Sequence, residues 1–563
     1  MRKILFVLVF FLAAFVVVHP SIAAENDTPN NKFGIHLAQP SEEDIKKARE
    51  LVNSQGGDWG YVTLVIQEND RNREKWQSTF DLLREYHLIP IIRLATSPDG
   101  EVWRIPSEED ANGWAQFLNS LNWVVKKRYV MLFNEPNQGQ EWGGETNPVG
   151  YAKVALAFAR KLKSTNPDFQ LMIAGFDASA PSNPPGLEDE RVFLQAVVDT
   201  FGSDTFNELI DGLSSHSYPN PGFAGPPSGF GKGSVRTYQW ELETLKSMGI
   251  KDLPVFITET GWDGDSLNRN LVAQYLKIAY ETVWLPDSRV VAVTPFILNY
   301  QGQPFLKFSW LKRGGTDPYP QFGLVQTIEK QKGSPSQTES ARLSGDLPKE
   351  MTVGSIYRFP VKITNTGQTI WKHEDGYSFH IDGVDSHYYF IPDMPTMKPF
   401  QEAQVYVYAQ TLEESPGVRS AIISLYKNNN KLMNIRNWSF EIVPQPSLAF
   451  GMKLTPSVIS DSNDYELQVF DDKDQLLYKQ TNVVVKEGRG SIAAIPNVVL
   501  NHRYRLVLLR AGFLPRQTMV LFKNGQNEVT FNWLIPLDFN QDGAFDSRDI
   551  NTIFTPPKDF VRN

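Results

Sequence analysis

Two glutamates stand where an apolar run passes into a polar loop. Glu135 lies in residues 133–137 (FNEPN), and Glu259 lies in residues 257–262 (ITETGW). Paired carboxyl groups can cleave a glycosidic bond, because one donates a proton to the leaving oxygen while the other attacks the anomeric carbon. This chemistry requires the two acids to meet and to differ in environment, so the fold has to bring two distant stretches together.

The elements that would position these acids are strands alternating with helices. From residue 32 to about residue 326, apolar runs alternate with amphipathic runs, as expected for parallel strands joined by crossover helices. Eight strand candidates begin at Phe33, Trp59, Leu88, Tyr129, Leu171, Leu209, Leu253 and Val290. Eight such repeats predict a (β/α)₈ (TIM) barrel, whose active site lies at the carboxyl ends of its strands. Glu135 and Glu259 end the fourth and seventh of these strands.

The run Asn134-Glu135-Pro136 on the fourth strand, together with Glu259 on the seventh, resembles the signature of the clan A glycoside hydrolases. These are retaining (β/α)₈ enzymes that include cellulases, mannanases, xylanases and β-xylosidases. The resemblance covers about residues 32–326. It implies that Glu135 is the acid/base, that Glu259 is the nucleophile and that Asn134 bonds the sugar 2-hydroxyl. In such a site the carboxyl groups should lie about 5 Å apart, whereas a gap near ~8 Å would indicate inversion.

Each glutamate also has an ordinary interpretation when it is taken alone. Glu135 could be a carboxylate at a helix start before Pro136, and Glu259 could be an exposed loop acid before Gly261. Their common position at strand ends, with Asn134 beside the first, favours the catalytic roles.

Two polar side chains end the predicted sixth strand. His216 and Tyr218, in residues 215–220 (SHSYPN), point the same way because alternate residues of a strand share a face. The resemblance implies that this pair supports the site, with the Tyr218 hydroxyl bonding the nucleophile. The alternative is a buried His and a packing Tyr. No second His follows at ligand spacing, which disfavours a metal role.

Arg93 and His36 are further candidates, on the third and first predicted strands. Arg93 ends an apolar run (IIRL, residues 91–94), and a buried guanidinium must be paired. A catalytic carboxylate is the expected partner of Arg93, although a structural ion pair is nearly as good an explanation. His36 could bond a sugar hydroxyl or be a core imidazole.

Four aromatic residues follow predicted strand ends and are candidates for substrate binding, namely Trp142, Trp262, Tyr300 and Trp310. Aromatic faces can stack on the apolar face of a pyranose. The resemblance implies a Trp after the eighth strand, where Trp310 is the nearest candidate and Tyr300 the alternative. Loop tryptophans can equally be core residues.

The composition limits the classes of partner. A chain of 563 residues suggests three or four domains. Its net charge is −9 and it has no Lys/Arg cluster, so no nucleic-acid partner is expected. Cys is absent, so neither disulfides nor thiol redox chemistry can operate.

Residues 1–23 predict a secretory signal peptide. Arg2 and Lys3 precede an unbroken apolar run, and residues 21–23 (SIA) offer the small residues of a cleavage site. The alternative is an uncleaved membrane anchor. The mature chain is therefore expected to be secreted. Association with the cell surface is also compatible with this pattern.

The segments beyond the predicted catalytic domain (30–328) favour β-structure. Residues 329–347 are polar and aperiodic, which predicts a linker. Residues 348–445 predict an Ig-like β-sandwich, and residues 446–535 predict a second one. Residues 365–371 (NTGQTIW) resemble the Asn-x-Gly-x-x-x-Trp motif of a group of accessory domains, in which the Trp is expected to be a core residue.

The last segment, residues 536–563, has the spacing of an EF-hand-type Ca²⁺ loop. Its expected ligands are Asp538, Asn540, Asp542, the Ala544 carbonyl and Asp549. The loop resembles one half of a dockerin, the module that attaches polysaccharide-degrading enzymes to cohesin-like scaffolds. A dockerin carries two such loops and this segment shows one, so a purely structural Ca²⁺ site is the alternative. Catalysis itself is expected to need no cofactor.

These observations predict a secreted retaining glycoside hydrolase that acts on a β-linked oligo- or polysaccharide of plant or microbial type. One alternative is a catalytically inactive carbohydrate-binding or cell-surface structural protein. Another is a transglycosylase, because the same covalent intermediate serves both reactions. The glycan, and endo versus exo action, stay open.

Overall fold

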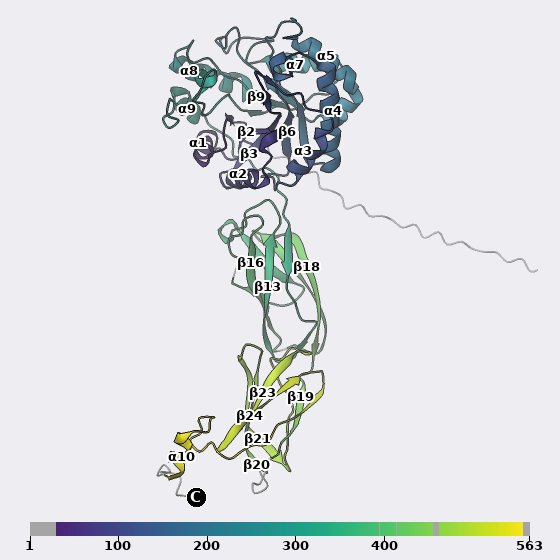
Figure 1. The fold of residues 1–563 in the computed structure, drawn as a ribbon, viewed down its shortest axis with the longest axis vertical. Helices are drawn as coiled ribbons and strands as arrows, with labels where there is room; N and C mark the ends of the chain where they lie inside the picture. The colour runs from purple at the N-terminus through teal and green to yellow at the C-terminus, as the bar shows by residue number, and fades with distance from the viewer. Residues whose placement is uncertain (1–29, 393, 413, 454–460, 555–563) are drawn as a thin grey trace, which may run out of the picture. The chain divides into compact units, whose positions relative to one another are not determined.

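The computed structural model describes residues 30–392, 394–412, 414–453 and 461–554. The predicted signal peptide, residues 1–23, lies outside the described residues. Within the described residues, no helix has the length and apolarity needed to cross a membrane. The chain divides after Ser336 into two compact units (Figure 1).

The first unit is built on eight parallel strands that match the eight predicted ones. They are β1 (Gly34–Leu37), β2 (Gly60–Gln67), β3 (Leu88–Ala95), β6 (Arg128–Leu132), β7 (Phe169–Ile173), β8 (Leu213–His216), β9 (Val255–Glu259) and β10 (Val290–Val293). Five of them form one sheet in the order β1-β2-β3-β6-β7, and three form another in the order β10-β9-β8. Parallel bridges from Phe33 to Val293 and from Met172 to Gly212 link the ends of the two sheets. All eight strands therefore follow one another around a ring in chain order.

Helices surround these strands (Figure 1). They are α1 (Glu42–Val52), α2 (Arg73–Glu85), α3 (Asp110–Asn119), α4 (Pro148–Thr165), α5 (Glu190–Phe201), α6 (Ser203–Leu209), α7 (Thr237–Ser247), α8 (Arg269–Ala279) and α9 (Pro320–Gln326). The start of α1 shows why such segments are helical. The Ser41 hydroxyl accepts a hydrogen bond from the Asp44 backbone amide. Three acidic residues occupy the first turn, where the helix dipole favours negative charge.

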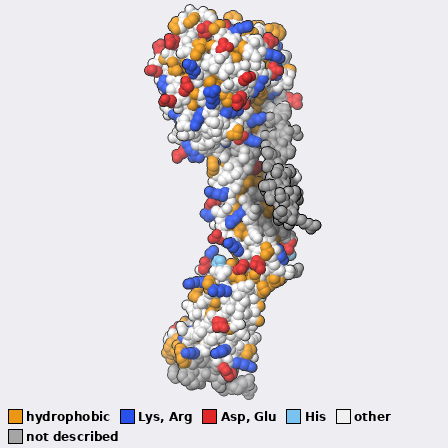
Figure 2. All heavy atoms as spheres, turned by 90° about the vertical axis from the view of Figure 1, so that its right-hand side faces the viewer, with side chains coloured by type: hydrophobic (Ala, Val, Ile, Leu, Met, Phe, Trp, Pro, Cys, Tyr) orange, Lys and Arg blue, Asp and Glu red, His pale blue; other side chains and the backbone are white. Residues whose placement is uncertain are grey.

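The strands of the first unit are buried on both faces, since the helices cover the outside and side chains fill the inside. Every residue of β1, β8 and β9 is buried, as expected for strands covered on both sides. The buried polar exceptions on β1, β8 and β9 include His36, His216 and Glu259, all close to the carboxyl end of their strand. Over the face of this unit shown in Figure 2, acidic and basic side chains are interspersed.

The second unit begins with a pair of four-stranded sheets that share one core. The first sheet has the order β11 (Ala341–Ser344), β13 (Ile356–Asn365), β16 (Glu402–Gln410), β15 (Tyr388–Ile391), and the second has the order β12 (Glu350–Thr352), β18 (Asn430–Val443), β17 (Gly417–Lys427), β14 (Tyr377–Asp382). Trp371 is fully buried in this core, as expected. Asn365 is buried too, and its amide donates to the carbonyls of Thr369 and Met397.

The predicted linker, residues 329–347, is corrected by the structure. Its first part belongs to the first unit. Lys332 forms a parallel β-bridge with Asp58, and the buried Lys330 ammonium donates to the Val325 carbonyl. Its later part belongs to the second unit, where β11 pairs with β13 and Glu339 accepts from the Trp371 indole at 2.7 Å. The polar composition that suggested a linker reflects residues whose backbone groups pair with neighbouring strands.

The rest of the second unit is a single seven-stranded sheet rather than a second pair of sheets. Its order is β24 (Phe513–Leu521), β23 (Arg503–Arg510), β20 (Ser462–Phe470), β21 (Leu476–Lys486), β22 (Arg489–Ile492), β19 (Ser447–Gly451), β25 (Gln526–Thr530). The strands join into one sheet because β19 pairs with β22 on one side and with β25 on the other. The short helix α10 (Ser547–Phe554) follows.

Candidate active site

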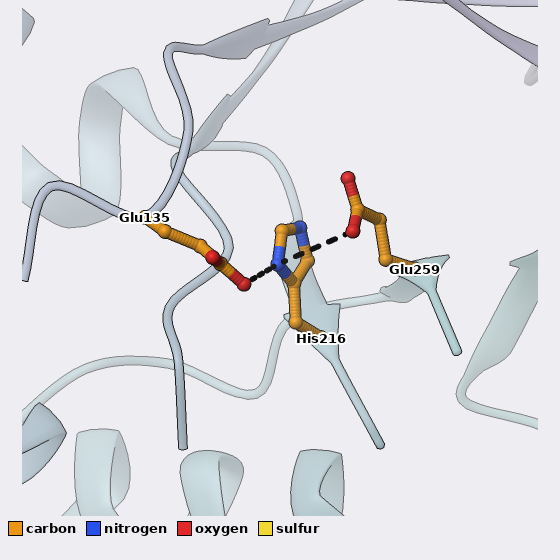
Figure 3. A group of neighbouring side chains, drawn as sticks. All are labelled: Glu135, His216 and Glu259. Atoms are coloured by element: carbon orange, nitrogen blue, oxygen red, sulfur yellow. Dashed lines mark hydrogen bonds and ion pairs between the residues drawn. The ribbon is translucent and has the colours of Figure 1, made fainter. Parts of the chain in front are cut away.

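The two predicted acids meet at the carboxyl ends of the strands. Glu259 is the last residue of β9, and Glu135 follows β6 in a turn where its φ is +32° and that of Phe133 is +72°. The Glu135 amide donates to the Gly175 carbonyl beyond β7, which fixes this turn. Figure 3 shows the two carboxyl groups on either side of His216, which ends β8. One oxygen of each acid and a nitrogen of His216 lie within 4.8 Å of one another.

Glu259 is surrounded by donors. Arg93 Nη1 donates to its Oε1 at 2.8 Å, and the Tyr218 hydroxyl donates to its Oε2 at 3.0 Å. Burial alone would raise the pKa of Glu259, but the charges of His216 and Arg93 and the Tyr218 hydrogen bond hold that pKa below its usual value. Glu259 is therefore ionised at neutral pH. The partner of Arg93 is one of the predicted acids, as the sequence suggested.

Glu135 has different surroundings. Its Oε1 lies 2.6 Å from His216 Nδ1, and its Oε2 accepts from the side chain of Gln138 at 2.8 Å. Burial raises the pKa of Glu135; His216 opposes this shift, and the negative charge of Glu259 reinforces it. The pKa of His216 is itself raised, because the two nearby glutamates outweigh its burial. The surroundings of Glu259 therefore favour its ionised form, whereas those of Glu135 favour its protonated form.

Asn134 links Arg93, the partner of Glu259, to a third acid, Glu141. Its Oδ1 accepts from Arg93 Nη1 at 2.7 Å, and its Nδ2 donates to Glu141 Oε2 at 3.2 Å. Burial raises the pKa of Glu141 to about 7. Sequence reasoning missed Glu141 and Gln138, although both lie within six residues of Glu135, in the loop that follows the Asn-Glu-Pro run.

The predicted aromatic residues are not gathered in the site. Trp142, Trp262 and Trp310 are 1%, 2% and 2% exposed, so their indoles pack in the core and have no free face for a sugar. Tyr300 is half-buried and packs edge-on against Phe305, with ring centroids 5.5 Å apart. The interpretation of the three tryptophans as sugar platforms is therefore corrected, because each one belongs to the buried core of the first unit.

Phe296 follows β10 and lies against the site instead. Its ring packs edge-on against His36, with centroids 5.1 Å apart, and it is half-buried. His36 Nε2 lies 4.0 Å from Glu259 Oε1, and its burial lowers the pKa of this imidazole to about 3, so His36 is neutral. Sequence reasoning overlooked Phe296 because it sought a Trp there, although Phe296 lies within the predicted eighth strand, three residues after the end of β10.

Glu135, His216 and Glu259 are, among the described residues, the one group of three acidic or imidazole side chains close enough to share a metal ion. However, the Arg93 guanidinium already contacts Glu259 at 2.8 Å. A cation between the acids would be repelled by this fixed positive charge. The group therefore suits proton transfer and nucleophilic attack better than metal binding.

The chain was compared with known proteins. No protein-family model matches it, and no curated protein matches it in sequence. Similar solved structures include a glucosidase from Croceicoccus marinus (TM-score 0.39, 11% identity, 86% of this chain and 95% of that chain covered). They also include an endo-β-1,4-glucanase from Xanthomonas axonopodis pv. citri (0.37, 14%, 53% and 98%) and a β-1,4-D-mannanase from Cryptopygus antarcticus (0.34, 11%, 55% and 97%). All three TM-scores are below 0.5.

Proposed function

We propose that the first unit is a (β/α)₈-barrel glycoside hydrolase that retains anomeric configuration, with Glu135 as acid/base and Glu259 as nucleophile. The observation that carries this proposal is the pair of carboxyl groups, which have opposite pKa shifts and of which one oxygen each lies within 4.8 Å of the other. Retaining enzymes have about 5 Å between these groups, whereas inverting enzymes need roughly 6.5–9.5 Å to admit a water. The two bridges that close the strand ring support the barrel.

In the first step, a Glu259 oxygen forms a bond to the anomeric carbon while the bond from that carbon to the leaving oxygen breaks. Glu135 gives its proton to the leaving oxygen. In the second step, Glu135 takes a proton from water as the water oxygen attacks the anomeric carbon, and Glu259 leaves as a carboxylate. Arg93 and Tyr218 stabilise the charge on Glu259 before and after the cycle.

The change of Glu135 from acid to base follows from the charge on its neighbour. While Glu259 is ionised, its negative charge raises the pKa of Glu135. Once Glu259 is glycosylated this charge is gone, so the pKa of Glu135 falls and the carboxylate can accept a proton. His216, 2.6 Å from Glu135, holds the acid in place throughout.

A substrate panel tests the proposed activity. The purified chain is incubated with glucans, mannans, xylans, galactans and aryl β-glycosides, and the anomer released first is identified by proton NMR. We expect a β-glycoside to give the β-anomer first. An α-anomer would overturn the retaining mechanism, and binding without release from any substrate would favour the inactive carbohydrate-binding alternative. Sugar acceptors added to the same assay measure transglycosylation.

The predicted signal peptide supports action on an extracellular β-linked polysaccharide. Attachment of residues 536–563 to a cohesin-like scaffold is likewise a proposal, and it is supported by the loop spacing alone.

Gly175 is expected to be essential to the geometry of the proposed acid/base. A Cβ at this position would lie 2.2 Å from His216 Cδ2 and 2.5 Å from His216 Nε2. The Gly175→Ala variant must therefore push the imidazole out of line with Glu135. We expect kcat/KM to fall about 10- to 100-fold, since a misplacement of ~1 Å can cost 10²-fold.

The matched control for this substitution is Gly186→Ala, where the nearest heavy atom to the new Cβ is 3.9 Å away. This variant should keep the activity of the unmodified chain. Equal activity of the Gly175→Ala and Gly186→Ala enzymes would show that His216 need not stand where the structure has it.

We further propose that residues 538–549 hold a structural Ca²⁺ ion. Asp538 Oδ1 is buried and, in the described part of the chain, has no hydrogen-bond partner, so a cation would satisfy it. Asp549 is fully buried, and its carboxylate accepts the amides of Phe539, Asn540 and Asp546. Among the described residues the loop's acids are not grouped as closely as the catalytic ones, so binding would have to draw them together.

Removal of Ca²⁺ is expected to destabilise the second unit. A ligand at 100 times its dissociation constant stabilises the folded state by about 2.7 kcal/mol. Calorimetric unfolding with Ca²⁺, with Mg²⁺ and with a chelator should show a higher midpoint in Ca²⁺ alone. The Asp542→Ala variant, which alters an exposed ligand, should lose this difference. A midpoint that is the same in Ca²⁺ and chelator would rule out the site.

A further inference from the structure

Glu141 is a third carboxyl group at the proposed active site, and the mechanism above does not use it. It ends a short 3₁₀ turn, η2 (Gly139–Glu141), in the loop after β6. Its side chain is half-buried, with Arg93, Asn134 and Trp142 lining the same small cavity. Burial, reinforced by the charges of Glu135 and Glu259 and opposed by Arg93, raises the pKa of Glu141 to about 7.

The contacts of Asn134 define the orientation of its amide. A guanidinium only donates hydrogen bonds, so the Asn134 atom 2.7 Å from Arg93 Nη1 has to be the oxygen. The Asn134 nitrogen is then the atom that lies 3.2 Å from Glu141 Oε2, and it donates to this oxygen. The Arg93 contact excludes the flipped amide, which would set donor against donor.

We propose that Glu141 is a positioning residue that holds the Asn134 amide so that Asn134 meets the substrate as a hydrogen-bond donor. The Asn134 oxygen is occupied by Arg93, and one of its two N–H groups is occupied by Glu141. The second N–H is the group left to bond a sugar oxygen beside the reacting carbon. Arg93 also contacts Glu259, so the orientation of Asn134 is set relative to the nucleophile. This inference rests on the proposed function.

The same chain of contacts makes Glu141 a determinant of specificity. A donor selects a substrate with a hydroxyl or another acceptor oxygen at that position, and it gains nothing from a substrate that lacks one. Without Glu141, Asn134 would keep its Arg93 contact but lose the partner that holds its nitrogen. The substrate contact would then be weakened rather than removed.

The test combines Glu141→Ala, Asn134→Ala and the double variant, assayed on an aryl β-glycoside that the unmodified chain hydrolyses and on its 2-deoxy analogue. We expect Glu141→Ala to lower kcat/KM about 10-fold on the parent substrate, the scale of one lost hydrogen bond. On the 2-deoxy analogue, and in the Asn134→Ala background, the same substitution should change kcat/KM by less than about twofold. Glu141→Gln keeps an acceptor and should restore most of the activity.

Glu145→Ala is the matched control, because Glu145 is an exposed acid of the same loop. It should leave both substrates unaffected. A Glu141→Ala loss that is equal on both substrates, or undiminished in the Asn134→Ala background, would mean that Glu141 acts only through the loop, and no loss at all would exclude any role. Failure of the proposed function looks different, because the unmodified chain would then hydrolyse no glycoside.

Discussion

The Glu259→Ala variant is expected to lose hydrolytic activity almost completely, with kcat/KM reduced by about 10⁴-fold or more. The carboxylate it removes is the group that would bond the anomeric carbon, and no other described acid is placed to replace it. Glu135 lies across the site beside His216, and Glu141 is turned toward Asn134. The measurement is the steady-state rate on an aryl β-glycoside whose leaving group needs little protonation.

Azide separates loss of the nucleophile from a general loss of structure. Removal of the carboxylate leaves space on the side from which the anomeric carbon is attacked. Azide is an anion small enough for this space, where Arg93 and Tyr218 can stabilise its charge. It should attack the anomeric carbon directly and give a glycosyl azide of inverted configuration. The exposed Glu145→Ala variant, handled identically, should form no azide product. Normal hydrolysis by Glu259→Ala, or no azide product, would mean that Glu259 is not the nucleophile.

Much of this site could be predicted because it lies on strand ends. Parallel strands in chain order bring residues at their carboxyl ends to one side of a sheet, so Glu259 and His216 had to lie near each other once the strands were found. That Arg93 is paired followed from the cost of burying an unpaired guanidinium, and the structure shows that its partner is Glu259. Alternation placed Tyr218 on the same side as His216, and its hydroxyl does reach Glu259.

The site residues that the sequence did not predict lie in loops beyond the strands, where hydrophobic periodicity gives no information. Gln138 and Glu141 are placed by a loop whose path depends on a left-handed turn at Phe133 and Glu135. The φ of a non-Gly residue in that region is set by tertiary contacts, here the bond of the Glu135 amide to the Gly175 carbonyl. The need for a small residue at Gly175 likewise arises only when β7 and β8 are side by side.

The tryptophans, in contrast, were predicted to lie in the site but lie in the core. Trp142 and Trp262 follow strand ends in sequence, which suggested that they face the site. Their indoles instead turn inward, and that of Trp262 donates to the Gly225 carbonyl in the loop after β8. A large aromatic side chain gains more from complete burial than from one exposed face unless a ligand covers it.

The Glu135→Ala variant is expected to lose activity in a way that depends on the leaving group. A general acid contributes about 10² to 10⁴-fold, and only when the departing oxygen needs a proton. With a polysaccharide or alkyl glycoside, kcat/KM should fall by that amount. With a dinitrophenyl glycoside the first step should be nearly unchanged, while the second step slows because no base activates water.

The pH profile provides a second measure of the role of Glu135. In the unmodified chain kcat/KM should fall as the pH rises through the pKa of Glu135, because the acid form is lost there, and this pKa lies above its usual value. It should fall at low pH as Glu259, whose pKa is lowered, becomes protonated. Removing Glu135 should abolish the basic limb and keep the acidic one. If Glu135→Ala kept the basic limb, or slowed activated and poor substrates equally, the proton donor would have to be His216 or another group.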